Sequence, residues 1–312
     1  MAWSQSTWKT KSSQWRKYVT FCGKVACAPV PADLRLLCRY VVYLARTLKY
    51  VSIQNYVSAV ISLNHYYGHD ISGLRSEFEF CTTMSGVRRM LGDPAPARPT
   101  LTITQLFKMA SAVNLADDNE RCMWAALVLG FRSLLRKSNL VPDNLNNSSG
   151  HFLRRGALQF REWGLEISIS SSKTIQYMQR VHVVPVVTAI GSPMCAVSLL
   201  WNHLQATPGL GPDAPAFMLR RGTKLCPLTY GVLLKFLKSL LLKAGIAAGN
   251  TGMHSLRRAG ALFMSEIGLS LEDIRQAGDW ASMAALLYLA KPLSLKVKSD
   301  AVVSRALRAY EI

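Results

Sequence analysis

The segment HSLRRAG, residues 254–260, carries the strongest chemical signal in this chain. It opens a predicted helix over about 254–267, so His254 and Arg257, three residues apart, lie one turn apart on the same helix face. Arginine forks two hydrogen bonds to phosphate oxygens, and histidine exchanges protons near neutral pH. The pair therefore suits a phosphate group, although taken alone the segment is explained better by a solvated basic helix end.

Further motifs flank this segment in a fixed order. LLRKSNL (134–140) and SKTIQ (172–176) precede it, and GDW (278–280) followed by ASMAALLY (281–288) comes after it. In this order the set resembles the tyrosine recombinase, or phage integrase, family. The residues of these motifs are most similar to those of the family's branch that DIRS-like and Crypton-like eukaryotic mobile elements carry. The resemblance covers nearly the whole chain and is more specific over 97–290, the catalytic part, than over the N-terminal helices.

The resemblance implies how the cationic residues would act. Arg136 and Arg257 would clamp the non-bridging oxygens of a scissile phosphate, where preorganised cations stabilise the negative charge of a pentavalent phosphorane. Lys173 would protonate the departing 5′-oxygen, and His254 would assist proton transfer and hydrogen-bond the phosphate. Many bacterial members carry an acid three residues after the first arginine, whereas this chain has Asn139. The resemblance therefore does not say which side chain would orient Arg136.

The resemblance also implies a nucleophile and its neighbour. Tyr288 would attack phosphorus and form a covalent 3′-phosphotyrosyl bond, which requires no metal, ATP or other cofactor. Tyr310 is the rival nucleophile, but it lies beyond the motif. The family usually has His or Trp about nine residues before the nucleophile. Here that position is Asp279, which would repel phosphate, so we expect Trp280, whose indole N–H can donate, to take the role.

Three of these residues also have ordinary structural explanations. Arg136 could form a salt bridge on a helix surface, Lys173 could be an exposed hairpin lysine, and Tyr288 could pack in an apolar helix. The order of the whole set favours the catalytic interpretation.

Charge and composition narrow the class of partner. The chain has 312 residues, with 37 Lys and Arg against 18 Asp and Glu, which is a net charge of +19. Half of the residues are hydrophobic, so disorder is excluded for most of the length. The first fifty residues hold nine basic side chains and one acid. Such a balance favours a polyanion, and the resemblance implies double-stranded DNA.

Several other classes of protein find no support in the sequence. The seven cysteines form no C-x-x-C pair, no glycine-rich nucleotide loop occurs, and His65 and His69 are more plausible as surface residues than as metal ligands. The N-terminus lacks the apolar core of a signal peptide. Proline and glycine interrupt the uncharged run 181–212, so it predicts strand, turn, helix and loop rather than a membrane span.

Hydrophobic periodicity predicts a mainly α fold with a small β-sheet (α+β). Residues 1–92 would form a compact helical unit, which by the resemblance is a SAM-like core DNA-binding domain, and the Pro-rich segment 93–102 would form a linker. Residues 103–312 would form a second domain, with a small sheet from strands at 165–170 and 181–187 and a tail at 291–312. By the resemblance this is the tyrosine recombinase catalytic domain. Thr102 and Gln105 predict a capping box at its first helix. Trp3, Trp8 and Trp15 fit helix packing better than base stacking.

The sequence thus favours a DNA recombinase or integrase that cleaves and rejoins strands to integrate or excise a mobile element. By the resemblance it would act as a homotetramer on two duplexes, with the tail docking on a neighbour or packing in its own subunit. A catalytically idle DNA-binding derivative and a type IB topoisomerase-like enzyme are the alternatives. The eukaryotic branch implies the nucleus; otherwise the cytoplasm or nucleoid is expected.

Overall fold

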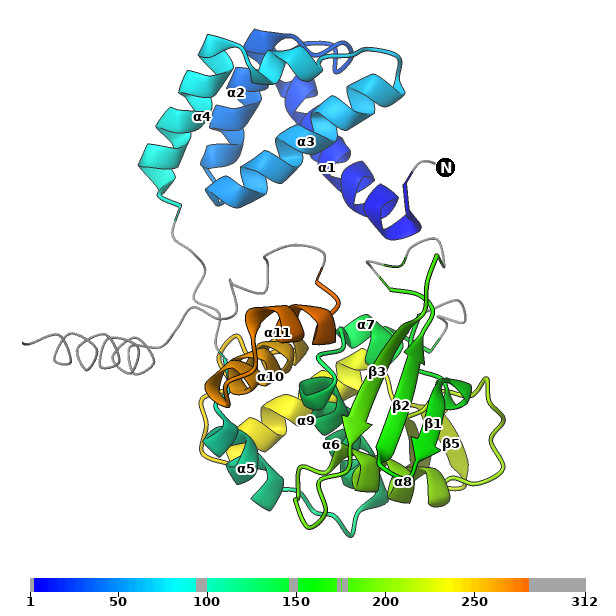
Figure 1. Ribbon diagram of the computed structural model, residues 1–312. Coiled ribbons are helices and arrows are strands. Elements are labelled where there is room, and N and C mark those ends of the chain that lie inside the picture. The colour runs from blue at the N-terminus through cyan, green and yellow to red at the C-terminus, as the bar shows by residue number, and fades with distance from the viewer. Residues whose placement is uncertain (1–2, 94–99, 146–150, 173–174, 176–178, 281–312) are drawn as a thin grey trace, which may run out of the picture. The chain divides into compact units, whose positions relative to one another are not determined.

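The chain divides into two compact units, residues 1–97 and 98–312 (Figure 1). The structure, a computed structural model, describes residues 3–93, 100–145, 151–172, 175 and 179–280. The division between the units falls inside the Pro-rich segment predicted to be a linker. The fold is mainly helical with small antiparallel sheets, as the sequence predicts. None of the helices in the described ranges is long and apolar enough to cross a membrane.

The first unit is a helical bundle. It consists of α1 (Gln5–Lys24), α2 (Leu34–Ala45), α3 (Tyr50–Tyr66) and α4 (Phe78–Leu91), with a 3₁₀ turn, η1 (Ser72–Arg75), before α4. The side chains of two N-cap residues begin the first two helices: Ser4 accepts from the Thr7 N–H in α1, and Asp33 accepts from the Leu36 N–H in α2. Apolar residues on the facing sides of the helices, Leu37, Leu44 and Ile53 among them, make up the buried core.

The tryptophans of this unit pack against other rings. The rings of Trp3 and Trp8 stack with centroids 5.7 Å apart, and Trp8 meets Tyr66 of α3 edge to face at 5.6 Å. Trp15 contacts Tyr67 at 5.9 Å. These contacts join the N-terminal segment and α1 to the end of α3, in agreement with the packing role.

Helices also build the core of the second unit. They are α5 (Ile103–Ser111), α6 (Asp118–Arg132), α7 (Lys137–Leu140), α8 (Ala196–Gln205), α9 (Tyr230–Lys243), α10 (Met253–Glu266) and α11 (Leu271–Ala277). The predicted capping box at Thr102 and Gln105 is present. Every residue from 124 to 131 in α6 is buried, so this helix runs through the centre of the unit.

A three-stranded antiparallel sheet packs on this helical core. Its strands are β1 (Leu158–Arg161), β2 (Gly164–Ile169) and β3 (His182–Val187), in the order β1-β2-β3. The predicted strands are confirmed as β2 and β3. The short strand β1 follows a 3₁₀ turn, η2 (Arg155–Ala157), and was not predicted. Alternate residues of β2 and β3 face the core, which places His182 on the same side of β3 as the buried Val184 and Val186.

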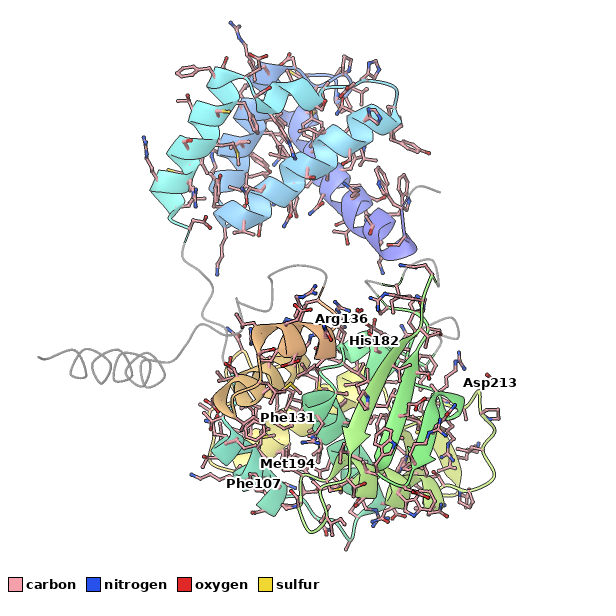
Figure 2. The ribbon with its side chains drawn as sticks, viewed as in Figure 1. Phe107, Phe131, Arg136, His182, Met194 and Asp213 are labelled. Carbon is pink, nitrogen blue, oxygen red and sulfur yellow. The ribbon has the colours of Figure 1, made fainter. Side chains whose placement is uncertain are left out.

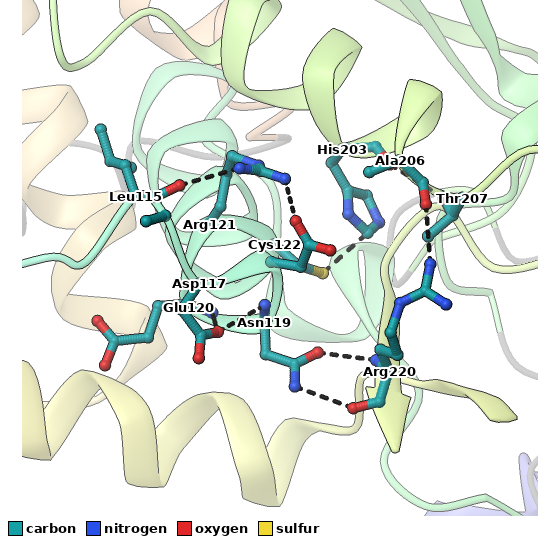
Figure 3. A network of polar contacts seen from close by, with 12 residues as sticks. Leu115, Asp117, Asn119, Glu120, Arg121, Cys122, His203, Ala206, Thr207 and Arg220 are labelled. Carbon is teal, nitrogen blue, oxygen red and sulfur yellow. Dashed lines mark hydrogen bonds and ion pairs between the residues drawn. The ribbon is translucent and has the colours of Figure 1, made fainter. Parts of the chain in front are cut away.

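A second hairpin, also not predicted, is fixed to the helices by side-chain contacts. It pairs β4 (Met218–Arg221) with β5 (Lys224–Pro227). The Asn119 amide donates to the Arg220 carbonyl at 2.9 Å and accepts from the Arg220 N–H at 2.7 Å, as an extra strand would (Figure 3). The buried His203 of α8 accepts from the Met218 N–H at 3.2 Å and contacts Cys122 of α6 at 3.6 Å. Four-residue strands held by such contacts carry little periodic signal.

Candidate active site

A small pocket lies between three parts of the second unit. They are the α6–α7 turn, the end of β2 with the paired start of β3, and the end of α11. Figure 2 shows Arg136 and His182 at this end of the second unit. Two of the predicted catalytic residues, Arg136 and Arg257, line it together. The lining is completed by polar, charged and small side chains with a few apolar ones: Ser133, Leu134, Leu135, Asn139, Ile169, Ser172, His182, Ala277, Gly278 and Asp279.

Arg257 lines this pocket and is held there by two backbone carbonyls. It lies in the first turns of α10, and only 2% of it is exposed. Its Nη1 donates to the carbonyl of Leu134 and its Nη2 to the carbonyl of Gly278. Each carbonyl lies at a turn with a left-handed residue, Leu134 itself at φ 51° and Asp279 at φ 49°. One guanidinium therefore ties together two turns whose backbone is strained.

Close helix packing brings α10 to this position. A Cβ on Gly260 would lie 2.2 Å from the carbonyl oxygen of Phe131 and 2.5 Å from a methyl of Leu134. Only glycine allows this approach between α10 and the end of α6. The approach places Arg257, one turn earlier, next to the α6–α7 turn.

The ring of Trp280 packs against the guanidinium of Arg257. Its ring centroid is 4.5 Å from the guanidinium carbon, a cation–π distance, and the residue is 7% exposed. The ring packs with Leu134 and Ile274, and it covers Gly278 so closely that a Cβ there would lie 2.1 Å from it. The structure thus gives Trp280 a packing contact with an arginine of the site. Its expected hydrogen bond to phosphate stays a prediction.

Arg136 occupies the N-cap position of α7 and is partly exposed. Asn139, three residues after Arg136, is 2% exposed. Its amide donates to the carbonyls of Ser171 at 2.9 Å and His151 at 3.3 Å. Asn139 therefore fixes α7 to the end of β2. A carboxylate could not donate these hydrogen bonds.

The predicted lysine lies next to this part of the site in sequence. Ser172 and Ile175 form an antiparallel bridge, with N–H to carbonyl distances of 3.2 and 3.1 Å, and both are buried. Lys173 follows Ser172, which lines the pocket. Lys173 itself, Tyr288, its rival Tyr310 and the tail lie outside the described residues.

His254 lies on the first turn of α10, one turn before Arg257, and is exposed. It is not among the residues that line the pocket. The two members of the HSLR motif therefore differ in burial although they share a helix face.

Sequence reasoning missed two features of the site. His182, at the start of β3, lines the pocket; burial lowers its pKa, Asp279 opposes that shift, and Arg180 and Arg257 add to it. The alternation in 181–187 could have placed His182 on the inner face. Arg180 also forms an ion pair with Asp279, 99 residues later, and no local pattern could have predicted that contact.

No metal site is formed by the residues that the structure describes: they contain no group of three His, Cys, Asp or Glu side chains suited to an ion. His65 and His69, the pair considered from the sequence, are both exposed in the first unit.

Comparison with solved structures decides the fold. The integrase of transposon Tn1549, in complex with transposon right end DNA, matches at a TM-score of 0.68 and 14% identity over 97% of this chain and 95% of that one. This chain has the tyrosine recombinase fold. A lambda integrase dimer bound to a COC′ core site (TM-score 0.61, 14% identity, 93% and 92% covered) matches this fold as well. So does XerH recombinase on palindromic difH substrate (0.60, 15%, 88% and 73%). No family model and no curated protein sequence matches the chain.

Within the tyrosine recombinase fold, the described members of the expected site occupy three positions. Arg136 and Arg257 line one pocket, Trp280 packs behind Arg257, and His254 lies on an exposed turn of the same helix. The arrangement can bind an anion between a rigid guanidinium and a more accessible one.

Proposed function

We propose that this protein is a site-specific DNA recombinase, or integrase, that cleaves and rejoins DNA strands through a 3′-phosphotyrosyl intermediate. The observation that carries the proposal is the placement of Arg136 and Arg257 in one pocket, from segments 121 residues apart. Two guanidiniums on a single pocket suit the two non-bridging oxygens of a phosphodiester, where negative charge accumulates in the phosphorane.

In the proposed reaction, the hydroxyl of Tyr288 attacks the phosphorus of the scissile phosphodiester. A phosphorus–oxygen bond forms to tyrosine while the bond to the 5′-oxygen breaks. Lys173 gives its proton to the leaving oxygen, and the tyrosine proton passes to His254. Arg136 and Arg257 stabilise the charge on the non-bridging oxygens. A 5′-hydroxyl from a second strand then reverses these steps and releases the tyrosine.

The geometry of Arg257 explains why its effect would be large. Because the guanidinium is already fixed by two carbonyls and a ring, no reorganisation is needed when negative charge develops. A preorganised donor of this kind typically contributes ~10²–10³ in rate.

Double-stranded DNA is the proposed partner of both units. The net charge of +19 and the exposed Lys9, Arg16 and Lys24 on α1 supply a cationic surface for the phosphate backbone. We propose a homotetramer on two duplexes, integration or excision of a mobile element as the role, and the nucleus as the compartment. Sedimentation of the protein–DNA complex and imaging of a tagged chain in eukaryotic cells test the assembly and the compartment.

Covalent trapping tests the chemistry. The full chain and Tyr288→Phe are incubated with nicked duplex DNA without metal or ATP, then denatured and resolved by electrophoresis, with Tyr310→Phe as the matched control. We expect an adduct with the wild type and with Tyr310→Phe but not with Tyr288→Phe. An adduct that is lost only in Tyr310→Phe would reassign the nucleophile.

Two alternatives are distinguished by this assay together with a plasmid-relaxation assay and a strand-joining assay. An idle DNA-binding derivative would bind DNA in a salt-sensitive manner and form no adduct. A type IB topoisomerase-like enzyme would form the adduct and relax supercoiled plasmid, but would not join strands of two duplexes.

A further inference from the structure

Asp279 places a carboxylate in the pocket that holds Arg136 and Arg257. Its side chain is only 14% exposed, and its backbone is in the left-handed region at φ 49°. An acid at this position is unfavourable for phosphate, because like charges repel most strongly where water is scarce. The site therefore contains a group that opposes the ligand for which its arginines are suited.

Arg180 compensates this charge from another part of the chain. Its Nη2 forms an ion pair with Oδ1 of Asp279 across 99 residues, and 47% of its side chain is exposed. Arg180 lies just before β3, whereas Asp279 lies just after α11. The pair is thus a charge contact at the edge of the pocket between two elements of the second unit.

Resting on the proposed function, we propose that Arg180 is a positioning residue: it neutralises and holds Asp279 so that a DNA phosphate can enter between Arg136 and Arg257. Asp279 in turn weakens the binding of any phosphate when Arg180 is displaced. The ion pair acts as an electrostatic gate on the site, distinct from the groups that contact the phosphate.

The surroundings of the pair support an electrostatic role. His182 of β3, Arg257 of α10 and Arg136 of the α6–α7 turn line the same pocket as Asp279, which is the acid among the pocket's lining residues. Burial lowers the pKa of His182, and Asp279 is the main influence that opposes this shift. The carboxylate therefore acts on His182 as well as on Arg180.

A charge gate and a purely mechanical tie predict opposite results. A mechanical tie is broken equally by Arg180→Gln and Asp279→Asn, so both variants would be impaired and the double variant would be no better. A gate makes Arg180→Gln harmful only while the aspartate remains. Asn is a suitable replacement because it keeps the shape of Asp and tolerates the left-handed backbone.

The test compares wild type, Arg180→Gln, Asp279→Asn and the double variant of the full chain. Arg221→Gln, at an exposed position of β4, is the control for losing one positive charge. The first readout is a thermal-shift titration with inorganic phosphate against chloride at equal ionic strength. The second is the rate of adduct formation on nicked duplex DNA.

We expect Arg180→Gln to weaken phosphate binding about tenfold and to slow adduct formation by a similar factor. Asp279→Asn should bind phosphate several-fold more tightly than wild type, and the double variant should return to within about threefold of it. Arg221→Gln should match wild type.

Other outcomes overturn the gate. They are equal impairment of both single variants, a double variant as weak as Arg180→Gln, or a wild type that shows no response to phosphate. Absence of an adduct from the wild type, with the phosphate series still in the expected order, would refute the proposed function and leave the gate standing.

Discussion

The guanidinium carbon of Arg257 lies 4.5 Å from the centroid of the Trp280 ring. The same ring covers Gly278, whose carbonyl accepts a hydrogen bond from Arg257. The positions of the three residues therefore depend on one another. The Trp280 ring packs against the Arg257 guanidinium, and it can do so only because residue 278 is a glycine.

Gly278→Ala tests this dependence. The new methyl would lie 2.1 Å from the Trp280 ring, so the ring must move and Arg257 loses its support. We expect the variant to lose about 1–3 kcal/mol of stability and at least tenfold in adduct formation. Thermal unfolding and the trapping assay measure the two effects. Gly231→Ala, in α9 with nothing within 4 Å of the added Cβ, should be neutral or slightly stabilising, and equal effects of both substitutions would contradict the account.

The two arginines of the pocket should respond differently to lysine. Arg257 is buried and donates to two carbonyls, so Arg257→Lys should lower both stability and the rate of adduct formation. Arg136 is partly exposed, so Arg136→Lys should slow adduct formation by ~10²-fold with little change in thermal stability. Chemical denaturation combined with single-turnover trapping separates these effects. Adduct formation by Arg136→Lys at the wild-type rate would argue against a phosphate contact.

Asn139→Asp should destabilise the second unit. The amide donates to the carbonyls of Ser171 and His151, and a buried carboxylate would instead face those two oxygens. We expect a loss of about 1–3 kcal/mol in the free energy of unfolding, measured by denaturant titration. Asn202→Asp, at an exposed position of α8, is the matched control and should change little. An unaffected Asn139→Asp would show that an acid fits here after all.

His203 should make stability depend on pH. Burial lowers its pKa to about 4, with help from Arg155 and Arg121, whereas an unfolded histidine titrates near ~6.5. Below pH ~6.5, His203 binds a proton in the unfolded chain but stays neutral in the folded chain until the pH approaches 4. Stability is therefore full above pH ~6.5 and falls as the pH decreases toward 4.

We expect this residue to account for about 2 kcal/mol between pH 7 and pH 5. Gln in place of His203 can still accept from the Met218 N–H but does not titrate. The free energies of unfolding of wild type and His203→Gln, measured at both pH values, should diverge by that amount. Parallel losses in the two proteins would show that other groups cause the dependence.

The sequence by itself determined the mainly helical character of the chain, two strands of the main sheet and the order of the chemical motifs. Periodicity of apolar residues encodes helices such as α3 and α10 locally, and a capping pair such as Thr102 and Gln105 lies within one turn. The pairing of His254 with Arg257 on one face is also a consequence of helix geometry alone. Short strands such as β1 and β4 were not predicted, because four residues are too few to show a clear alternation of apolar and polar side chains.

Only the tertiary structure decided how these motifs meet. It buried Arg257 and left His254 exposed, placed the Trp280 ring behind the guanidinium, and brought Arg180 to Asp279. Such contacts join residues many tens of positions apart and depend on the close approach of α10 to α6, which no short-range pattern encodes. Burial and charge pairing are properties of the packed chain, and in this site they determine which cation is buried and which acid forms an ion pair.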